Sequence, residues 1–136
     1  MVGILIISHG TLGECVKDTA AMIVGPRDNV AALALNRNDK VEFFSEKIKI
    51  AVAKLDTGEG VLIFADMFGG TPCNAAMALY HSSDKISVLT GFNLPIVIEA
   101  LMHSNKPLEE LVKGLMDKKE KTIVDAKAFF KKKAVK

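Results

Sequence analysis

Short, continuous apolar runs alternate along the chain with stretches in which apolar residues recur every three or four positions. The runs are Val2–Ile7, Val30–Leu35, Val61–Ala65 and Ile86–Thr90. They show no polar alternation, which is typical of strands covered on both faces in a parallel sheet. The pattern therefore predicts an α/β fold of the doubly wound kind, with a mainly parallel sheet and helices on both faces.

The stretches between the runs predict amphipathic helices. The apolar stripe of the first consists of Leu12, Cys15, Val16, Thr19, Ala20 and Ile23. A glycine and a proline at positions 25 and 26 end that helix. A second helix is expected from about Asp39 to just before Gly58, and a third after Thr71-Pro72, which would be its N-cap and first-turn proline. Two further helices are expected from Leu94 to about Met102 and from Pro107 to about Met116.

One segment near the C-terminus fits neither pattern. The apolar residues of Thr122–Ala128 follow neither the helical nor the strand period well, so a helix continuation and a short edge strand both stay open. No internal repeat or linker composition interrupts the chain, and its length is that of one domain. We therefore expect a single domain over residues 1–136.

Polar segments follow the first and the third predicted strands, at Ser8–Thr11 and Asp66–Thr71. In a doubly wound sheet of strand order 2-1-3-4, ligands collect beyond the carboxyl ends of the first and third strands. His9 and Asp66 would be neighbours at that point. The carboxylate would accept one imidazole N–H and leave the other ring nitrogen free as a nucleophile.

Taken singly, these features are commonly structural, because strand-end histidines, glycine pairs and Thr-Pro helix starts recur in many folds. Their convergence at one point favours a functional site. Gly69 and Gly70 lack side chains, so backbone N–H groups can approach an anion closely, and Thr71 and Thr11 add hydroxyl donors. A nucleophilic imidazole beside such a cradle suits an acyl or a phosphoryl group.

Composition and charge exclude several other classes of protein. The chain is 49% hydrophobic and 25% charged, which argues against disorder, and its apolar runs are shorter than the ~18 residues of a membrane span. The segment Lys118–Lys136 holds eight lysines against two acidic residues, a net charge of +6, whereas the first 117 residues carry −4. Because aromatic residues make up only 6%, we expect this basic end to be a solvated tail or helix face and no nucleic-acid site.

The cysteines and histidines indicate no metal centre. Cys15 and Cys73 lack disulfide or metal-ligand spacing, so we expect small core residues in a protein of the reducing cytoplasm. His81 and His103 lie in polar surroundings without a paired ligand residue, and we predict that both lie at the surface. No metal or cofactor is expected, because the nucleotide-binding patterns GxxxxGK(S/T) and GxGxxG are absent where they would be needed.

Three segments are similar to one protein family: Gly3–Gly10, Asp66–Asn74 and Thr90–Pro95, which read GILIISHG, DMFGGTPCN and TGFNLP. The chain resembles the mannose-type enzyme IIA component, of the mannose, fructose and sorbose family, in the bacterial phosphoenolpyruvate-dependent sugar phosphotransferase system. The likeness covers nearly the whole chain in order and length. It implies a phosphotransferase that works through a covalent phosphohistidine.

The resemblance implies roles for the residues of the predicted site. His9 would accept a phosphoryl group on Nε2 from the phosphocarrier protein HPr and pass it to an enzyme IIB domain during sugar uptake, with Asp66 bound to Nδ1. The phosphate-binding residues would be Gly69, Gly70 and Thr71, together with Thr11. Phe68, where relatives often carry Trp, and Asn93 would face the partner proteins.

The resemblance also implies a homodimer in which the last strand of each subunit lies antiparallel in the partner's sheet. Thr122–Ala128 would then be this exchanged edge strand. Membrane contact would be indirect, through the IIC/IID permease.

Two rival interpretations stay open: a subunit that relays phosphate to a dihydroxyacetone kinase, and a non-catalytic flavodoxin-like binding or regulatory module in which His9 is only structural. The sequence does not disclose the sugar.

Overall fold

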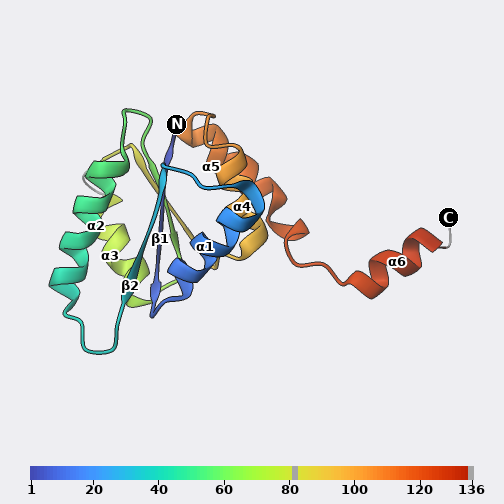
Figure 1. Cartoon of the computed structure of the whole chain (residues 1–136), viewed down its shortest axis with the longest axis horizontal. Helices are drawn as coiled ribbons and strands as arrows, with labels where there is room; N and C mark the ends of the chain where they lie inside the picture. Colours follow the sequence, from blue (N-terminus) through green and yellow to red (C-terminus); the bar gives the residue numbers. More distant parts are fainter. Residues whose placement is uncertain (81–82, 135–136) are drawn as a thin grey trace.

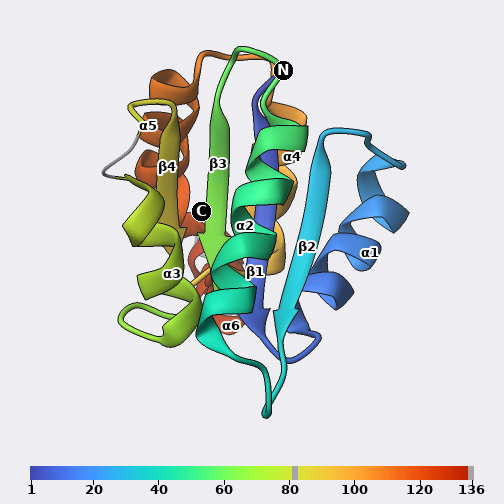
Figure 2. The ribbon, with the colours of Figure 1, turned by 90° about the vertical axis from the view of Figure 1, so that its left-hand side faces the viewer.

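The computed structural model describes residues 1–80 and 83–134. At its centre is a four-stranded parallel sheet in the order β2-β1-β3-β4 (Figure 2). The strands are β1 (Gly3–His9), β2 (Val30–Leu35), β3 (Val61–Ala65) and β4 (Ile86–Thr90). The predicted order and the four strands are confirmed, but β1 continues beyond its apolar run to include Ser8 and His9.

Helices cover both faces of the sheet, as predicted. They are α1 (Leu12–Val24), α2 (Val41–Leu55), α3 (Thr71–Tyr80), α4 (Leu94–Met102) and α5 (Leu108–Lys118). Helices α2 and α3 lie on one face, and α1, α4 and α5 lie on the other (Figure 1). Within the described residues, no helix combines the length and the apolar character needed to cross a membrane.

Alternate residues of the central strand fill two separate cores. Ile4 and Ile6 of β1 pack with residues of α1, α4 and α5, whereas Leu5 and Ile7 pack with residues of α2 and α3. All four side chains are fully buried. Because side chains alternate along a strand, an unbroken apolar run is what a strand with two covered faces requires.

Helix α1 buries a different part of its apolar stripe than the sequence predicts. Cys15 is exposed and Ile23 is 59% exposed, so the prediction that Cys15 is a core residue was wrong. The buried face runs instead through Gly13 and Ala20. Gly13 packs so closely that a Cβ there would lie 3.1 Å from Ile6 Cγ2, and this contact turns the predicted stripe partly towards solvent. The other cysteine, at position 73, is buried as predicted.

The chain leaves the body of the fold after α5. A short 3-10 helix, η1 (Lys119–Lys121), follows, and α6 (Ala126–Ala134) then stands away from the sheet and its covering helices (Figure 1). Residues 122–125 form neither helix nor strand, and α6 begins inside the segment Thr122–Ala128. The edge strand expected there is therefore not formed in this chain. A strand needs a neighbour for its backbone groups, and no strand of the described residues pairs with this segment.

The carboxyl ends of all four strands lie at one edge of the sheet, because the strands are parallel. The β1–α1 and β3–α3 loops are neighbours there, since β1 pairs directly with β3. Helix α3 begins at Thr71 itself, one residue earlier than the sequence predicts, and the amide of Asn74 donates to the carbonyl of Gly70 at 2.9 Å. This early start brings the first turn of α3 close to the end of β1.

Candidate functional site

His9 and Asp66 are in direct contact at the carboxyl ends of β1 and β3. The ring Nδ1 of His9 lies 2.7 Å from Oδ2 of Asp66, although the two residues are 57 positions apart in the sequence. The backbone N–H of His9 donates to the same oxygen at 3.0 Å. One carboxylate oxygen therefore holds both the ring and the backbone of His9, which fixes the orientation of the imidazole. His9 and Asp66 are therefore neighbours in the structure, as the sequence predicts.

Hydrogen bonds keep Asp66 in its ionised form. Burial by itself raises the pKa of this carboxyl, but hydrogen bonds from the amide and ring of His9 and from the amide of Met67 outweigh burial, so the net pKa lies below its ordinary value. The Met67 amide donates to Oδ1 at 3.0 Å. With an ionised acceptor on one side, the ring carries its proton on Nδ1 and its lone pair on Nε2.

Gly70 packs against the other side of the imidazole. A Cβ at position 70 would lie 3.1 Å from Cε1 and 3.8 Å from Nε2 of His9. The His9 side chain is 50% exposed, so the imidazole reaches solvent. The absence of a side chain at Gly70 therefore keeps the approach to Nε2 open.

The rest of the β3–α3 loop carries neutral hydrogen-bond donors, a kind of group that can bind an anion. Gly69 has a φ of 81°, a left-handed conformation that favours glycine. The side-chain Nδ2 of Asn74 donates to the Gly69 carbonyl at 3.3 Å and ties this turn to α3. The hydroxyl of Thr71 has no hydrogen-bond partner in the part of the chain that the structure describes. The loop that contacts the imidazole through Gly70 thus leads directly into the first-turn amides of α3 and the Thr71 hydroxyl.

The two residues predicted to face partner proteins lie in different environments. Phe68, between Asp66 and Gly69, is 84% exposed. Asn93 is half-buried: its Oδ1 accepts from the Ile96 amide at 3.0 Å as N-cap of α4, and its Nδ2 donates to Thr122 Oγ1 at 2.9 Å. Both residues line a groove of about 600 Å³ beside β4. Asn93 therefore has internal contacts that the sequence did not reveal.

Sequence reasoning missed three residues that support the site. Met67 and Asn74 hold the β3–α3 loop through the contacts described above, and Ser8 holds the β1–α1 loop. The role of Ser8 could have been suspected, because it is a polar residue at the end of an apolar strand. No feature of the sequence indicated the roles of Met67 and Asn74, because their contacts depend on the shape of the turn between them.

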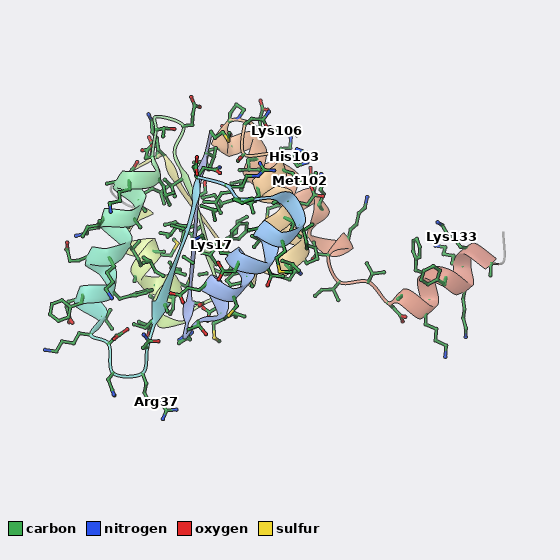
Figure 3. All side chains as sticks on the ribbon, in the orientation of Figure 1. Lys17, Arg37, Met102, His103, Lys106 and Lys133 are labelled. Atoms are coloured by element: carbon green, nitrogen blue, oxygen red, sulfur yellow. The ribbon has the colours of Figure 1, made fainter. Side chains whose placement is uncertain are left out.

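The other histidines do not join this site. His103 follows α4 and lies at the opposite end of the molecule from Arg37, which is on the loop after β2 (Figure 3). It was predicted to lie at the surface; in the structure it is half-buried, and its Nε2 lies 3.3 Å from Oε2 of Glu99. His81 lies outside the described residues. Within residues 1–80 and 83–134, no group of three or more His, Cys, Asp or Glu residues is placed to hold a metal ion.

This arrangement suits the transfer of an anionic group. It combines an oriented imidazole, a second ring nitrogen that has no hydrogen bond within the described residues, and the neutral donors of the adjoining β3–α3 loop. The donors are dipoles without a formal charge, so they stabilise an anion without binding it as strongly as a lysine or an arginine.

Comparisons with known proteins identify the family of this chain. The family model of the PTS system fructose IIA component matches residues 3–116. The chain is 36% identical over 101 residues to the PTS system mannose-specific EIIAB component of Escherichia coli K12, covering 74% of this chain and 31% of that protein. It is 29% identical over 116 residues to the PTS system fructose-specific EIIA component of Bacillus subtilis 168, covering 85% of this chain and 80% of that protein.

A solved structure has the same fold. The PTS IIA protein associated with the fucose utilization operon of Streptococcus pneumoniae superposes with a TM-score of 0.81 at 29% identity, covering 96% of this chain and 99% of that one. The chain spans less than a third of the E. coli EIIAB component. The activity of that whole protein is therefore not assigned to this chain by the match. The match over residues 3–116 nevertheless confirms the resemblance seen in the sequence. The chain belongs to the EIIA-man family, that of the fructose IIA component of the sugar phosphotransferase system.

Proposed function

We propose that this chain is a phosphoryl carrier of a sugar phosphotransferase system and that His9 carries the group as a covalent phosphohistidine. It accepts the group from phospho-HPr and donates it to an enzyme IIB domain during sugar uptake. The observation that carries the proposal is the 2.7 Å contact between Nδ1 of His9 and Oδ2 of Asp66, which leaves Nε2 as the free nucleophile. Membership of the EIIA-man family supports the two partners.

In the accepting step, the lone pair of Nε2 forms a bond to phosphorus while the bond from phosphorus to the donor atom of HPr breaks. The electron pair of the broken bond stays on the donor. The proton on Nδ1 of His9 stays in place, so the ring becomes positively charged when both nitrogens are substituted. The carboxylate of Asp66, 2.7 Å away, stabilises that charge. Transfer to the IIB domain breaks the bond from Nε2 to phosphorus and restores the neutral ring.

Neutral donors around Nε2 are proposed to bind the phosphoryl oxygens. They are the amides of the turn at Gly69 and Gly70 and the hydroxyls of Thr71 and Thr11. The open face of the ring at Gly70 supports this assignment, as does the hydroxyl of Thr71, which has no partner among the described residues. Phosphoryl transfer depends mainly on alignment and charge stabilisation, so a set of dipoles is sufficient for a group that must be passed on.

Partner proteins are proposed to dock over Phe68 and the nearby end of the groove that Asn93 lines. Phe68 is a large apolar side chain, 84% exposed, in the loop that holds the glycine pair. A partner that brings its phosphoryl group in line with Nε2 must cover this loop. The cytoplasm remains our prediction for the compartment in which the exchange occurs.

Labelling with phosphoenolpyruvate, enzyme I and HPr tests the function. We expect the wild-type chain to give an acid-labile phosphohistidine signal and His9→Ala to give none. Asp66→Asn should keep the fold, checked by circular dichroism, but accept the group more slowly, because it removes the charge that orients and stabilises the ring. Equal labelling of the wild type and His9→Ala would contradict the proposal.

We further propose that the chain forms a homodimer by exchange of residues Thr122–Ala128. On one side β4 pairs with β3, and its other edge has no strand beside it among the described residues. The groove along this edge is lined mainly by apolar residues, among them Ile123 of the same chain. Ile123 and Val124 of the C-terminal arm are nevertheless 83% and 57% exposed. An extended arm from a second copy would satisfy the free edge of β4 and bury these side chains.

A further inference from the structure

Ser8 is a fully buried polar residue next to the proposed phosphoryl carrier. Its side chain lies beneath the β1–α1 loop and makes two hydrogen bonds. The hydroxyl oxygen accepts from the amide of Gly13 at 2.8 Å, and the hydroxyl proton is donated to the carbonyl of Gly10 at 3.1 Å. One side chain thus connects the end of β1 to both ends of the turn that follows His9.

The bond to Gly13 replaces the usual cap of α1. Thr11 is the N-cap residue, and the side chain of an N-cap normally accepts from the amide two or three positions later. Thr11 makes no such bond, and its φ of −91° and ψ of 9° differ from the extended conformation that capping side chains normally require. Gly13 is the residue two positions after Thr11, so Ser8 accepts the hydrogen bond that Thr11 would otherwise take.

We propose that Ser8 is a positioning residue of the phosphoryl site, which caps α1 from within the core and so leaves the hydroxyl of Thr11 free to bind the phosphoryl group on His9. This inference rests on the proposed function. Without the Ser8 hydroxyl, the Gly13 amide would be buried without an acceptor, at a substantial cost in free energy. Thr11 is then the nearest replacement: its backbone would have to move to the extended conformation of a capping residue, and this change would turn its side chain from the phosphoryl group to the helix.

A second buried serine provides a matched control. Ser104 is 2% exposed, and its hydroxyl donates to the carbonyl of Leu101 at 3.2 Å. It follows α4 near His103, at the opposite end of the sheet from the carboxyl ends of the strands. Ser8→Ala and Ser104→Ala therefore each remove one buried hydroxyl, but only the first change is next to His9.

The experiment measures phosphorylation by phospho-HPr and, separately, spontaneous hydrolysis of the phosphorylated chain. We expect Ser8→Ala to accept the group about tenfold more slowly than wild type, the effect of losing one well-placed hydrogen bond. Its phosphohistidine should also hydrolyse faster. Ser104→Ala should match the wild type in both rates, and Ser8→Thr, which keeps the hydroxyl, should restore transfer. Urea unfolding of each variant separates these effects from a loss of stability.

A double-mutant cycle with Thr11 tests the route by which Ser8 acts. Thr11→Ala in the wild-type background should slow transfer, because a phosphate donor is lost. The same change in the Ser8→Ala background should have little further effect, since Thr11 has already turned to the helix. Equal effects of Thr11→Ala in both backgrounds would overturn the inference, as would equal transfer rates for Ser8→Ala and Ser104→Ala. If the wild-type chain is not phosphorylated at all, the proposed function itself fails.

Discussion

At the scale of single residues, two atoms of His9 contact one and the same oxygen of Asp66. The ring Nδ1 and the backbone amide both donate to Oδ2 of Asp66, so the imidazole cannot rotate without losing a hydrogen bond in a partly buried site. The same contacts lower the pKa of Asp66. The carboxylate therefore affects both the chemistry of the ring and the stability of the fold.

The lowered pKa of Asp66 predicts a pH-dependent stability. Its carboxyl has a pKa below the ordinary 3.8 in the folded chain, so it stabilises the fold above pH 3.8 and loses this contribution as the pH falls through the folded value. We expect Asp66→Asn to have a lower free energy of unfolding than the wild type at pH 7. The difference should disappear in strong acid, as measured by urea unfolding across the pH range.

Asp117 offers a control for this experiment. It is exposed on α5, and its side chain has no hydrogen bond or ion pair within the described residues. Asp117→Asn should leave the unfolding free energy close to that of the wild type at every pH. A difference between the wild type and Asp66→Asn that stays constant from pH 7 into strong acid would count against the hydrogen-bonded carboxylate.

The two adjacent glycines predict opposite effects on activity and stability. In Gly70→Ala the new Cβ would lie 3.1 Å from Cε1 of His9, so we expect the ring to shift and phosphorylation to slow about tenfold or more. In Gly69→Ala nothing lies within 4 Å of the new Cβ, but the φ of 81° is strained for alanine and costs roughly 1–2 kcal/mol of stability. Phosphoryl-transfer rates measure the effect expected for Gly70→Ala, and urea unfolding measures the loss of stability expected for Gly69→Ala. A rate loss larger in Gly69→Ala than in Gly70→Ala would contradict it.

At the scale of secondary structure, the helices that follow β1 and β4 are capped in different ways. Helix α4 has a local cap, because Asn93 precedes it directly and accepts from the amide of Ile96. Helix α1 takes its cap from Ser8, which lies within the preceding strand. A local cap can be identified in a sequence, whereas the second kind depends on how the strand and helix pack.

The cap at α4 predicts a measurable loss of stability. Asn93→Ala removes the acceptor for the Ile96 amide and should lower the free energy of unfolding by about 1 kcal/mol. Asn93→Asp keeps that acceptor but loses the Nδ2 donor to Thr122, so it should retain most of the stability. Urea unfolding distinguishes the two variants. If both lose the same amount, the bond to Thr122 and not the cap is the stabilising contact.

At the scale of the whole molecule, the C-terminal arm is the part that lies outside the core. Its basic helix α6 includes Lys133, which Figure 3 shows well away from the sheet. Phe129 and Phe130 on this helix are 49% and 68% exposed. In the isolated chain, the arm therefore buries little apolar surface, whereas strand exchange would bury more of it.

The exposed arm and the free edge of β4 predict a dimer in solution. We expect the wild type to sediment as a dimer and the double variant Ile123→Asp, Val124→Asp to dissociate, because exchange would bury both side chains and a buried unpaired charge is costly. Met22→Asp is the control, since Met22 is 85% exposed on α1, away from the β4 edge. Sedimentation velocity at several concentrations measures the outcome. A monomeric wild type, or a double variant that stays dimeric, would contradict strand exchange.

Local patterns in the sequence determined the elements and their order. Val30–Leu35 and Ile86–Thr90 are strands as predicted, because an unbroken apolar run fits a strand with two covered faces. Parallel strand order then predicted that His9 and Asp66 meet, although they are 57 positions apart. This could be inferred because the topology of an α/β sheet follows from the sequence of its elements.

Only the tertiary structure decided the contacts that depend on how the elements pack. The exposure of Cys15, the bond from Gly13 to Ser8 and the clearance between Gly70 and the imidazole all follow from the approach of a helix or loop to a strand. Such approaches are set to within an ångström by side chains from several elements, and no local period in the sequence records them. For the same reason the sequence left Thr122–Ala128 open, since the conformation of an arm depends on the surface against which it packs.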